Sequence, residues 1–309
     1  MTDNRPFIDR PPLLDRRSLL AGSAALGLAS CVPVTPTLAD RFALRLRILE
    51  AGANGVLGAS FLDTGTGQLV SHNGYARFPH ASSFKLSLAA MVLAREQAGV
   101  IDANRTVRWT EGDLMPVSPF TTERLAQGAT LRELARATQV TSDNAAANVL
   151  LRELGGPEAL TAFWRSLGDE ISRLDRTEPE LNAVPPGELR DTTTPDAMAR
   201  TVAALLYGPV LDAPRKAELR QWLIETQTGM QRVRAGLPAD WPAGDKTGTS
   251  IAPGMGGVYV DLGFVEPPGR APITFATYFR AATQHTRMEP AALAVLADCG
   301  RVLAQWAAR

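Results

Sequence analysis

The chain has 309 residues, 45% of them hydrophobic, so it can bury a substantial core as one large domain or two small ones. Its 32 basic and 32 acidic residues balance, and no basic run exceeds a pair, which argues against a nucleic-acid partner. The three histidines are scattered without ligand spacing, and the two cysteines, Cys31 and Cys299, are too few for a disulfide framework. We therefore expect no metal site and no other cofactor.

Residues 1–39 have the pattern of an export segment. Arg16 and Arg17 precede a short apolar run of small residues, which is typical of bacterial twin-arginine signals and too short to span a bilayer. The run ends in Leu-Ala-Ser-Cys, which resembles a lipobox and would make Cys31 a lipid-carrying N-terminus. Cleavage after Ala39 would instead suit an ordinary signal peptidase. We favour the lipobox, and expect a periplasmic protein that could be tethered to a membrane.

The first elements after the export segment are a helix, two strands and a second helix. Residues 43–50 have amphipathic helical spacing, and residues 55–63 and 68–71 read as two strands around a glycine-containing turn. Residues 84–94 are apolar on almost every side, which predicts a helix that is buried all round.

The middle of the chain, from about residue 100 to 225, has mainly helical spacing. Its clearest helices are predicted at 129–138, 143–153 and 157–167, and another starts near 194–196. Between them, residues 169–191 lack periodicity and contain three prolines, which predicts a long loop. Loops of this length in compact domains are usually functional.

The last part of the chain returns to strands, at 245–250, 258–265 and 273–280, and ends in a helix over 289–307. Strands at both ends with helices between them predict an α/β layer built by the two termini and a separate helical lobe. We place the α/β subdomain at 40–73 and 225–309, and the helical subdomain at 74–224.

Lysine is rare in this chain, which has three lysines against 29 arginines. Arginine cannot lose its proton in a protein, whereas a buried lysine can, so the remaining lysines mark places where arginine would not serve. Codon bias explains the scarcity but not the placement, because two of the three, Lys85 and Lys246, lie in short chemical motifs. Lys216 has no such context and reads as a solvated surface charge.

The first motif is Ser82-Ser-Phe-Lys85, at the start of the apolar helix. Residues three apart lie on one helical face, and the helix N-terminus offers free backbone N–H groups. A lysine buried there has its ammonium form disfavoured and can act as a base toward the serine. Taken alone, the pair would more often be a serine and a lysine without any role.

Three further segments are weak when each is taken alone. Ser142-Asp143-Asn144 could simply cap a helix, and Lys246-Thr247-Gly248-Thr249 could be a turn, although Gly248 would let a ligand approach the strand. The loop segment 178–182 carries Glu178 and Asn182, and carboxylates in loops are usually only solvated.

Together and in this order, the Ser-x-x-Lys, Ser-Asp-Asn and Lys-Thr-Gly motifs form the set found in class A β-lactamases and penicillin-binding proteins. The sequence resembles the class A serine β-lactamases over residues 40–309. The resemblance extends to Phe78-Pro79, Ser118-Pro119, Ala146-Ala147-Asn148, and both ends of the family's omega loop at 173–182 and 190–195. It implies an α/β fold in which an antiparallel sheet flanked by helices joins an all-helical lobe, with the active site between them.

The resemblance also implies catalytic roles. Ser82 would attack the lactam carbonyl and form an acyl-enzyme, while Lys85, or Glu178 through a water, takes its proton. Ser142 would pass a proton to the departing lactam nitrogen. Glu178 and Asn182 would position the water that hydrolyses the acyl-enzyme.

Other residues are implied to bind the substrate or to support the site. The backbone N–H groups of Ser82 and Thr249 would hold the oxyanion. Asn144 would bind the side-chain amide of the substrate. Lys246, Thr247 and Thr249 would receive the substrate carboxylate, supported by Arg232. Gly248 and Ser250, on the same strand, would also bind the substrate. The omega loop would be supported by Arg176, Asp191 and Asn148.

The chain also departs from parts of the family. Ala89 and Ala135 occupy positions that some members bridge by a disulfide, and Val117 lies where an aromatic residue often walls the cleft. Carbapenem-hydrolysing members often have a cysteine pair where this chain has Ala81 and Ser250, which lowers that expectation without excluding it.

The sequence is compatible with three functions. The expected one is an exported, monomeric β-lactamase that hydrolyses penicillins and cephalosporins and so confers antibiotic resistance. A penicillin-binding carboxypeptidase or transpeptidase shares three motifs, but Glu178 and Asn182 in a long loop favour hydrolysis. A catalytically silent lipoprotein that binds cell-wall peptide is disfavoured, because both Ser82 and Lys85 are present.

Overall fold

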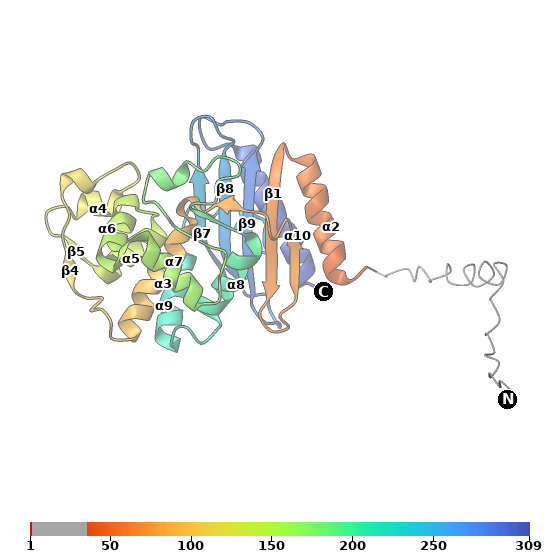
Figure 1. Cartoon of the computed structure of the whole chain (residues 1–309), viewed down its shortest axis with the longest axis horizontal. Coiled ribbons are helices and arrows are strands. Elements are labelled where there is room, and N and C mark those ends of the chain that lie inside the picture. The colour runs from red at the N-terminus through yellow and green to blue at the C-terminus, as the bar shows by residue number, and fades with distance from the viewer. Residues whose placement is uncertain (2–35) are drawn as a thin grey trace. The chain divides into compact units, whose positions relative to one another are not determined.

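The structure is a computed structural model that describes Met1 and residues 36–309 (Figure 1). The expectations for the twin arginines and for lipidation at Cys31 lie outside the described residues. Among the helices of the described part, none is both long and apolar enough to cross a membrane. Within 37–309 the chain forms one compact unit.

A five-stranded antiparallel sheet lies at the centre of this unit, with the order β2-β1-β9-β8-β7 (Figure 1). Its strands are β1 (Gly55–Asp63), β2 (Leu69–His72), β7 (Ala243–Ser250), β8 (Val258–Val265) and β9 (Ile273–Ala281). Strand β1 pairs along its whole length with β9, from Gly55 opposite Ala281 to Asp63 opposite Ile273. Both ends of the chain therefore contribute to one sheet, as the sequence predicts.

Helices α2 (Leu38–Gly52) and α10 (Pro290–Ala307) cover one face of the sheet (Figure 1). Alternate strand residues, such as Phe61 on β1 and Phe275 on β9, are buried against these helices. Helix α2 begins five residues before the predicted start at residue 43. The reason is a capping box, in which Thr37 accepts from the backbone N–H of Asp40 while Asp40 accepts from that of Thr37.

The other face of the sheet packs against the helical part of the chain, where α8 contacts β1, β8 and β9 and α9 contacts β7. The helices of this part are α3 (Phe84–Gln97), α4 (Pro119–Glu123), α5 (Leu131–Val140), α6 (Asn144–Leu154), α7 (Gly156–Ser166), α8 (Pro195–Leu206) and α9 (Ala213–Glu225). Residues 84–93 of α3 are all buried, which confirms the predicted helix that is buried all round. The predicted fold class is likewise confirmed.

Short elements complete the fold and bring distant segments together. Strand β3 (Phe78–Pro79) pairs with β6 (Thr192–Thr193), and β4 (Thr106–Val107) pairs with β5 (Ala129–Thr130). The 3₁₀ turns are η1 (Ala81–Ser83), η2 (Glu111–Asp113), η3 (Glu180–Asn182) and η4 (Val233–Gly236). The β3–β6 pair places the start of α3 beside the end of the 169–191 loop.

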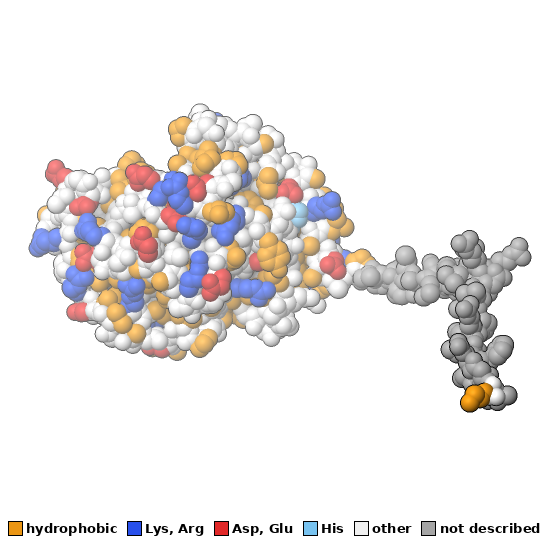
Figure 2. Space-filling view, in the orientation of Figure 1, with side chains coloured by type: hydrophobic (Ala, Val, Ile, Leu, Met, Phe, Trp, Pro, Cys, Tyr) orange, Lys and Arg blue, Asp and Glu red, His pale blue; other side chains and the backbone are white. Residues whose placement is uncertain are grey.

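Charges on the surface are mixed. Figure 2 shows Lys and Arg side chains interspersed with Asp and Glu on the face in view. This face therefore presents no extended field of a single sign.

His80, which precedes η1, is fully buried and stacks on Trp164 with 4.8 Å between ring centroids. Burial lowers the pKa of His80 to about 4, because the charged imidazolium would lose its water there. The folded state therefore binds this proton less readily than the unfolded chain, whose histidine titrates at a pKa of about 6.5.

We predict that His80 makes the protein acid-sensitive. Its stabilising contribution is complete above about pH 6.5 and is lost as the pH falls toward about 4, which amounts to about 3 kcal/mol. Unfolding free energies from urea titration at pH 7 and pH 4 should therefore differ less in His80→Phe, which keeps an aromatic stack, than in the wild type. Equal losses in both proteins would contradict this assignment.

Candidate active site

Ser82 and Lys85 lie at the buried start of α3. Ser82 belongs to η1, so its hydroxyl is at the helix entrance, and Lys85 follows one turn later on the same face. The Lys85 side chain is completely buried, and its Nζ donates to Ser82 Oγ at 3.0 Å. The spacing of the first motif therefore produces the contact that the sequence predicts.

Lys85 reaches three other oxygen atoms. Its Nζ lies 3.1 Å from Glu178 Oε1, donates to the backbone carbonyl of Ser142 at 3.0 Å, and also donates to Asn144 Oδ1. Burial lowers the pKa of Lys85, and the Glu178 carboxylate opposes that shift. Because burial and the carboxylate act in opposite directions on its pKa, the Lys85 amine can hold a proton and can also release it to a neighbouring group.

Glu178 is positioned by two asparagines. Asn148 on α6 donates to the backbone carbonyl of Glu178 at 2.8 Å and accepts from its N–H at 3.0 Å. Asn182 Nδ2 donates to Glu178 Oε2 at 2.6 Å. The other carboxylate oxygen, Oε1, lies 3.4 Å from Ser82 Oγ. The peptide bond between Glu178 and Pro179 is cis.

The loop that carries Glu178 is closed at its base by an ion pair. Arg176 Nε donates to Asp191 Oδ2 at 2.5 Å, and the buried Asp191 also accepts from the backbone N–H groups of Asp175 and Arg176 at 2.8 and 2.9 Å. These bonds join the two ends of a long loop, so that Glu178 can point inward from a rigid frame.

The second motif forms the opposite wall. Asp143 caps α6 by accepting from Ala146 N–H at 2.8 Å, which confirms its predicted capping role, and it also accepts from Thr121 N–H on α4 at 2.9 Å. Ser142 just before it has a φ of +59°, a conformation that is strained for a side chain other than glycine. Its hydroxyl accepts from Lys246 Nζ at 3.0 Å.

Lys246 begins the third motif on β7 and is also fully buried. Burial, together with the nearby cations Lys85 and Arg232, lowers the pKa of Lys246 well below its usual value. Gly248 on the same strand faces η1 so closely that an added Cβ would meet His80 O at 2.8 Å and Ser82 N at 3.1 Å. Glycine is therefore required for β7 to lie against the nucleophile.

The end of β7 connects the site to two other segments. Arg232, which is buried, donates to Gly248 O at 2.8 Å and to Thr249 Oγ1 at 2.6 Å. Ser250 Oγ donates to Asn182 O at 2.8 Å, so the strand edge is joined to the loop. Thr247 Oγ1 is bonded to Thr228 Oγ1 at 2.7 Å.

The structure thus brings all the predicted site residues of the 82–250 segment into one region. The Asn144 side chain accepts from Lys85 and donates to Pro116 O at 2.9 Å, and its expected contact with the substrate stays a prediction. Val117 is 62% exposed with a φ of +61°.

Sequence reasoning missed three supporting residues, Thr228, Thr121 and Arg234. Arg234 forms an ion pair with the buried Asp245, the residue before Lys246, at 2.5 Å. An aspartate next to the motif lysine, in a strand that faces a core, was a signal that a cation would have to accompany it. Thr228 and Thr121 carry no such signal.

The arrangement suits acyl transfer. A serine hydroxyl has a lysine amine at 3.0 Å and a carboxylate at 3.4 Å, and a second lysine–serine pair stands across the site. Proton acceptors and donors are thus placed for both attack by the serine and departure of a leaving group. In the described residues there is no cluster of three or more side chains that could hold a metal ion.

Comparisons with known proteins agree with this geometry. A model of the Beta-lactamase enzyme family matches residues 41–307. The carbapenem-hydrolyzing β-lactamase KPC of Klebsiella oxytoca is 44% identical and covers 92% of this chain and 95% of its own. The β-lactamase AST-1 of Nocardia asteroides is also 44% identical, over 91% and 93% of the two chains.

Solved structures give the same result. An ancestral class A β-lactamase superposes with a TM-score of 0.81 at 46% identity, over 85% of this chain and 99% of its own. A β-lactamase from Xanthomonas campestris gives 0.82 at 36% identity, over 88% and 100% of the two chains. The chain belongs to the β-lactamase enzyme family. Within that family it is a class A serine β-lactamase, a hydrolase that opens the β-lactam ring and so gives antibiotic resistance.

Proposed function

We propose that this β-lactamase works through an acyl-enzyme on Ser82 that a water activated by Glu178 hydrolyses. The observation that carries the proposal is the position of Ser82 Oγ, 3.0 Å from Lys85 Nζ and 3.4 Å from Glu178 Oε1. In acylation, the serine proton passes to Lys85, or to Glu178 through a water, while Oγ bonds to the lactam carbonyl carbon. Both bases lie within reach, and the two routes stay open.

The later steps use the remaining contacts. The tetrahedral oxyanion is held by the backbone N–H groups of Ser82 and Thr249, and closeness of β7 to η1 at Gly248 supports this. Ser142, which accepts from Lys246, gives its hydroxyl proton to the lactam nitrogen as its bond to carbon breaks, and the proton taken from Ser82 in acylation is passed on to restore that hydroxyl. Glu178, again unprotonated, then takes a proton from the water that attacks the ester, and this proton is returned to Ser82 Oγ as the ester bond breaks.

For the substrate range, we propose penicillins and cephalosporins, including cephalosporins with bulky side chains. Lys246 and Arg232 place two cations around Thr247 and Thr249, which suits the carboxylate that these substrates carry. The bond from Ser250 to Asn182 fixes the distance between β7 and the loop, where the substrate side chain would lie. The relative KPC is named for carbapenem hydrolysis, and Ala81 and Ser250 remain an argument against extending that activity to this chain.

For localisation, we propose export by the twin-arginine signal to the periplasm and lipidation at Cys31, with a monomeric catalytic domain. The capping box of α2 supports this choice of cleavage site. Cleavage after Ala39 would remove Thr37, and loss of such an N-cap costs a helix about 1 kcal/mol. Cleavage before Cys31 leaves the cap in the mature chain.

We predict that Glu178→Gln accumulates the acyl-enzyme. An amide cannot accept the proton of the deacylating water, so ester hydrolysis should slow by about 10²–10⁴-fold while acylation through Lys85 continues. Intact-protein mass spectrometry after brief mixing with a penicillin should show a stable adduct in this variant, little in the wild type and none in Ser82→Ala. A long-lived adduct on the wild type would instead indicate a penicillin-binding protein, and an adduct on Ser82→Ala would remove the assigned nucleophile.

Arg232→Ala should raise the KM for a chromogenic cephalosporin by about tenfold or more. The reason is that the substitution removes the second cation proposed to stabilise the substrate carboxylate. Steady-state kinetics of this variant, compared with the surface control Arg200→Ala, measures the effect, and circular dichroism checks that both are folded. Unchanged KM and kcat/KM in Arg232→Ala would show that the second cation has no part in binding.

Cys31→Ala should release the protein from membranes. Lipoprotein modification adds several acyl chains, which together give stable anchoring, so the wild type should sediment with the membrane fraction. Fractionation followed by an activity assay compares the two proteins, and the mass of the soluble product fixes its N-terminus. If both proteins were equally soluble in the periplasm, Cys31 would not be the anchor.

A further inference from the structure

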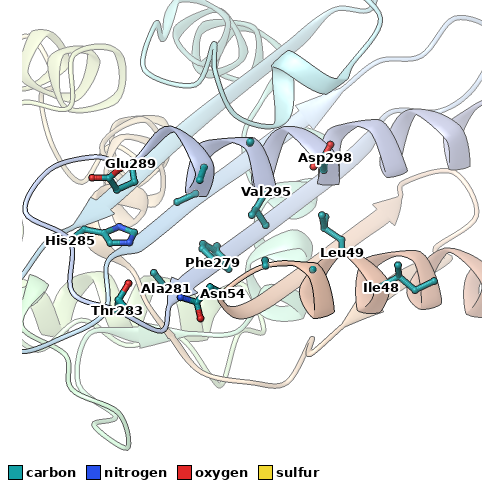
Figure 3. Close-up of a pocket in the computed structure, with 15 residues that line it drawn as sticks. Ile48, Leu49, Asn54, Phe279, Ala281, Thr283, His285, Glu289, Val295 and Asp298 are labelled. Atoms are coloured by element: carbon teal, nitrogen blue, oxygen red, sulfur yellow. The ribbon is translucent and has the colours of Figure 1, made fainter.

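A cavity of about 600 Å³ lies on the face of the sheet opposite to the helical part of the chain, away from Ser82 (Figure 3). It is formed by the second half of α2, the end of β9, the 282–289 segment and the first half of α10. Its size is within the range of sites that hold small molecules. No step of the proposed catalysis uses this cavity.

The walls of the cavity are apolar over most of their length. Leu49 on α2, Phe279 on β9 and Val295 on α10 face one another across its middle, as Figure 3 shows. Ile48 continues the apolar wall and is 63% exposed, although it is a large hydrophobic residue. An apolar chain or ring would therefore gain by leaving water for this space.

One end of the cavity is polar. Asn54, Thr283, His285 and Glu289 gather there (Figure 3). Within residues 36–309, the side chains of Asn54 and Thr283 make no hydrogen bond, and His285 uses only Nδ1, with Tyr259 Oη at 2.7 Å. This end can therefore bind the polar head of a ligand.

The charges of the lining favour a cationic head. The lining includes Glu289 and Asp298 but neither lysine nor arginine. Asp298 is already paired with Arg301. Glu289 at the polar end forms an ion pair with Arg287, with 3.5 Å between Glu289 Oε1 and Arg287 Nε. The arginine side chain is 82% exposed, so this pair is weak.

The wall of the cavity also supports the Arg232 region. Tyr259 Oη, which contacts His285, accepts from the backbone N–H of Glu289 at 3.0 Å, and Tyr259 lies opposite Thr249 across the β7–β8 pair. Met288 Sδ, in the same segment, lies 3.7 Å from Arg232 Nη2. A ligand that moves the 285–289 segment would therefore disturb the residues next to Thr249.

We propose that this cavity binds a cationic amphiphile, with the apolar body between α2 and α10 and the ammonium group beside Glu289, and that binding weakens the binding of substrate. The two sites are distinct and share the 285–289 segment, so coupling between them is reciprocal. Substrate should likewise reduce the affinity for the amphiphile.

The test uses decyltrimethylammonium below its micellar concentration, with decanoate as the anion of equal chain length. Isothermal titration calorimetry should detect one decyltrimethylammonium per chain, bound about tenfold or more tightly than decanoate. Ala294→Trp fills the cavity from an exposed position and should abolish binding. Glu289→Gln should weaken binding several-fold, whereas Leu44→Trp, at an exposed position of α2 outside the cavity, should not affect it.

The kinetic arm measures the coupling. Saturating decyltrimethylammonium should raise the KM of a chromogenic cephalosporin several-fold in the wild type, with kcat changed by less than about twofold, and should leave Ala294→Trp unaffected. No binding, or equal binding by Ala294→Trp, would overturn the site. Equal binding of decanoate would overturn its charge preference. Binding without a change in KM would overturn the coupling alone, and because calorimetry does not depend on Arg232, it separates this failure from an error in the role proposed for Arg232.

Discussion

The ammonium group of Lys85 is fully buried at the start of α3, and most of the site is arranged around that fact. A lone charge in such a place would be very costly, and the pKa of Lys85 is lowered accordingly. Four oxygen atoms from three segments stabilise it: those of Ser82 at the helix start, Glu178 in the loop, and Ser142 and Asn144 in the turn where α6 begins. Each of these segments is in turn fixed by its own contacts, so helix, loop and turn must be in place together. The positions of these catalytic side chains therefore follow from the need to supply hydrogen-bond acceptors to one buried amine.

The same reasoning extends to the cations around it. Lys246 and Arg232 are both buried and both have lowered pKa values. Nearby acids offset them only weakly, since Asp245 already pairs with Arg234 and the pKa of Asp261 is raised by burial and by Asp245. The protein therefore supplies little free negative charge at the end of β7. An anionic substrate that binds there can neutralise the positive charge of Lys246 and Arg232.

Much of this could be predicted from the sequence because the relevant signals are local. The apolar run after Ser82 predicts a helix buried all round, and the spacing of Ser82 and Lys85 places both on one face. The lack of periodicity in residues 169–191 likewise predicts the loop that carries Glu178. These inferences need only the helical repeat and the cost of burying a charge.

The remaining features depend on contacts between distant segments and could not be predicted in that way. Helix α2 begins at Leu38 because Thr37 caps it, and a single Thr–Asp pair is too common a signal to fix a start. The β3–β6 pair is two residues long. The hydroxyl of Ser250 bonds to Asn182, 68 residues away, and no local pattern indicates its partner.

The pairing of β1 with β9 joins the first strand of the sheet to the last, with Gly55 opposite Ala281. During synthesis β1 must therefore wait, unpaired along one edge, until nearly the whole chain has left the ribosome. Contacts of such long sequence separation slow folding and expose strand edges in the meantime. The protein thus cannot complete its sheet from a partial chain. If the twin-arginine export proposed above carries the folded protein, export must wait until these two strands have paired.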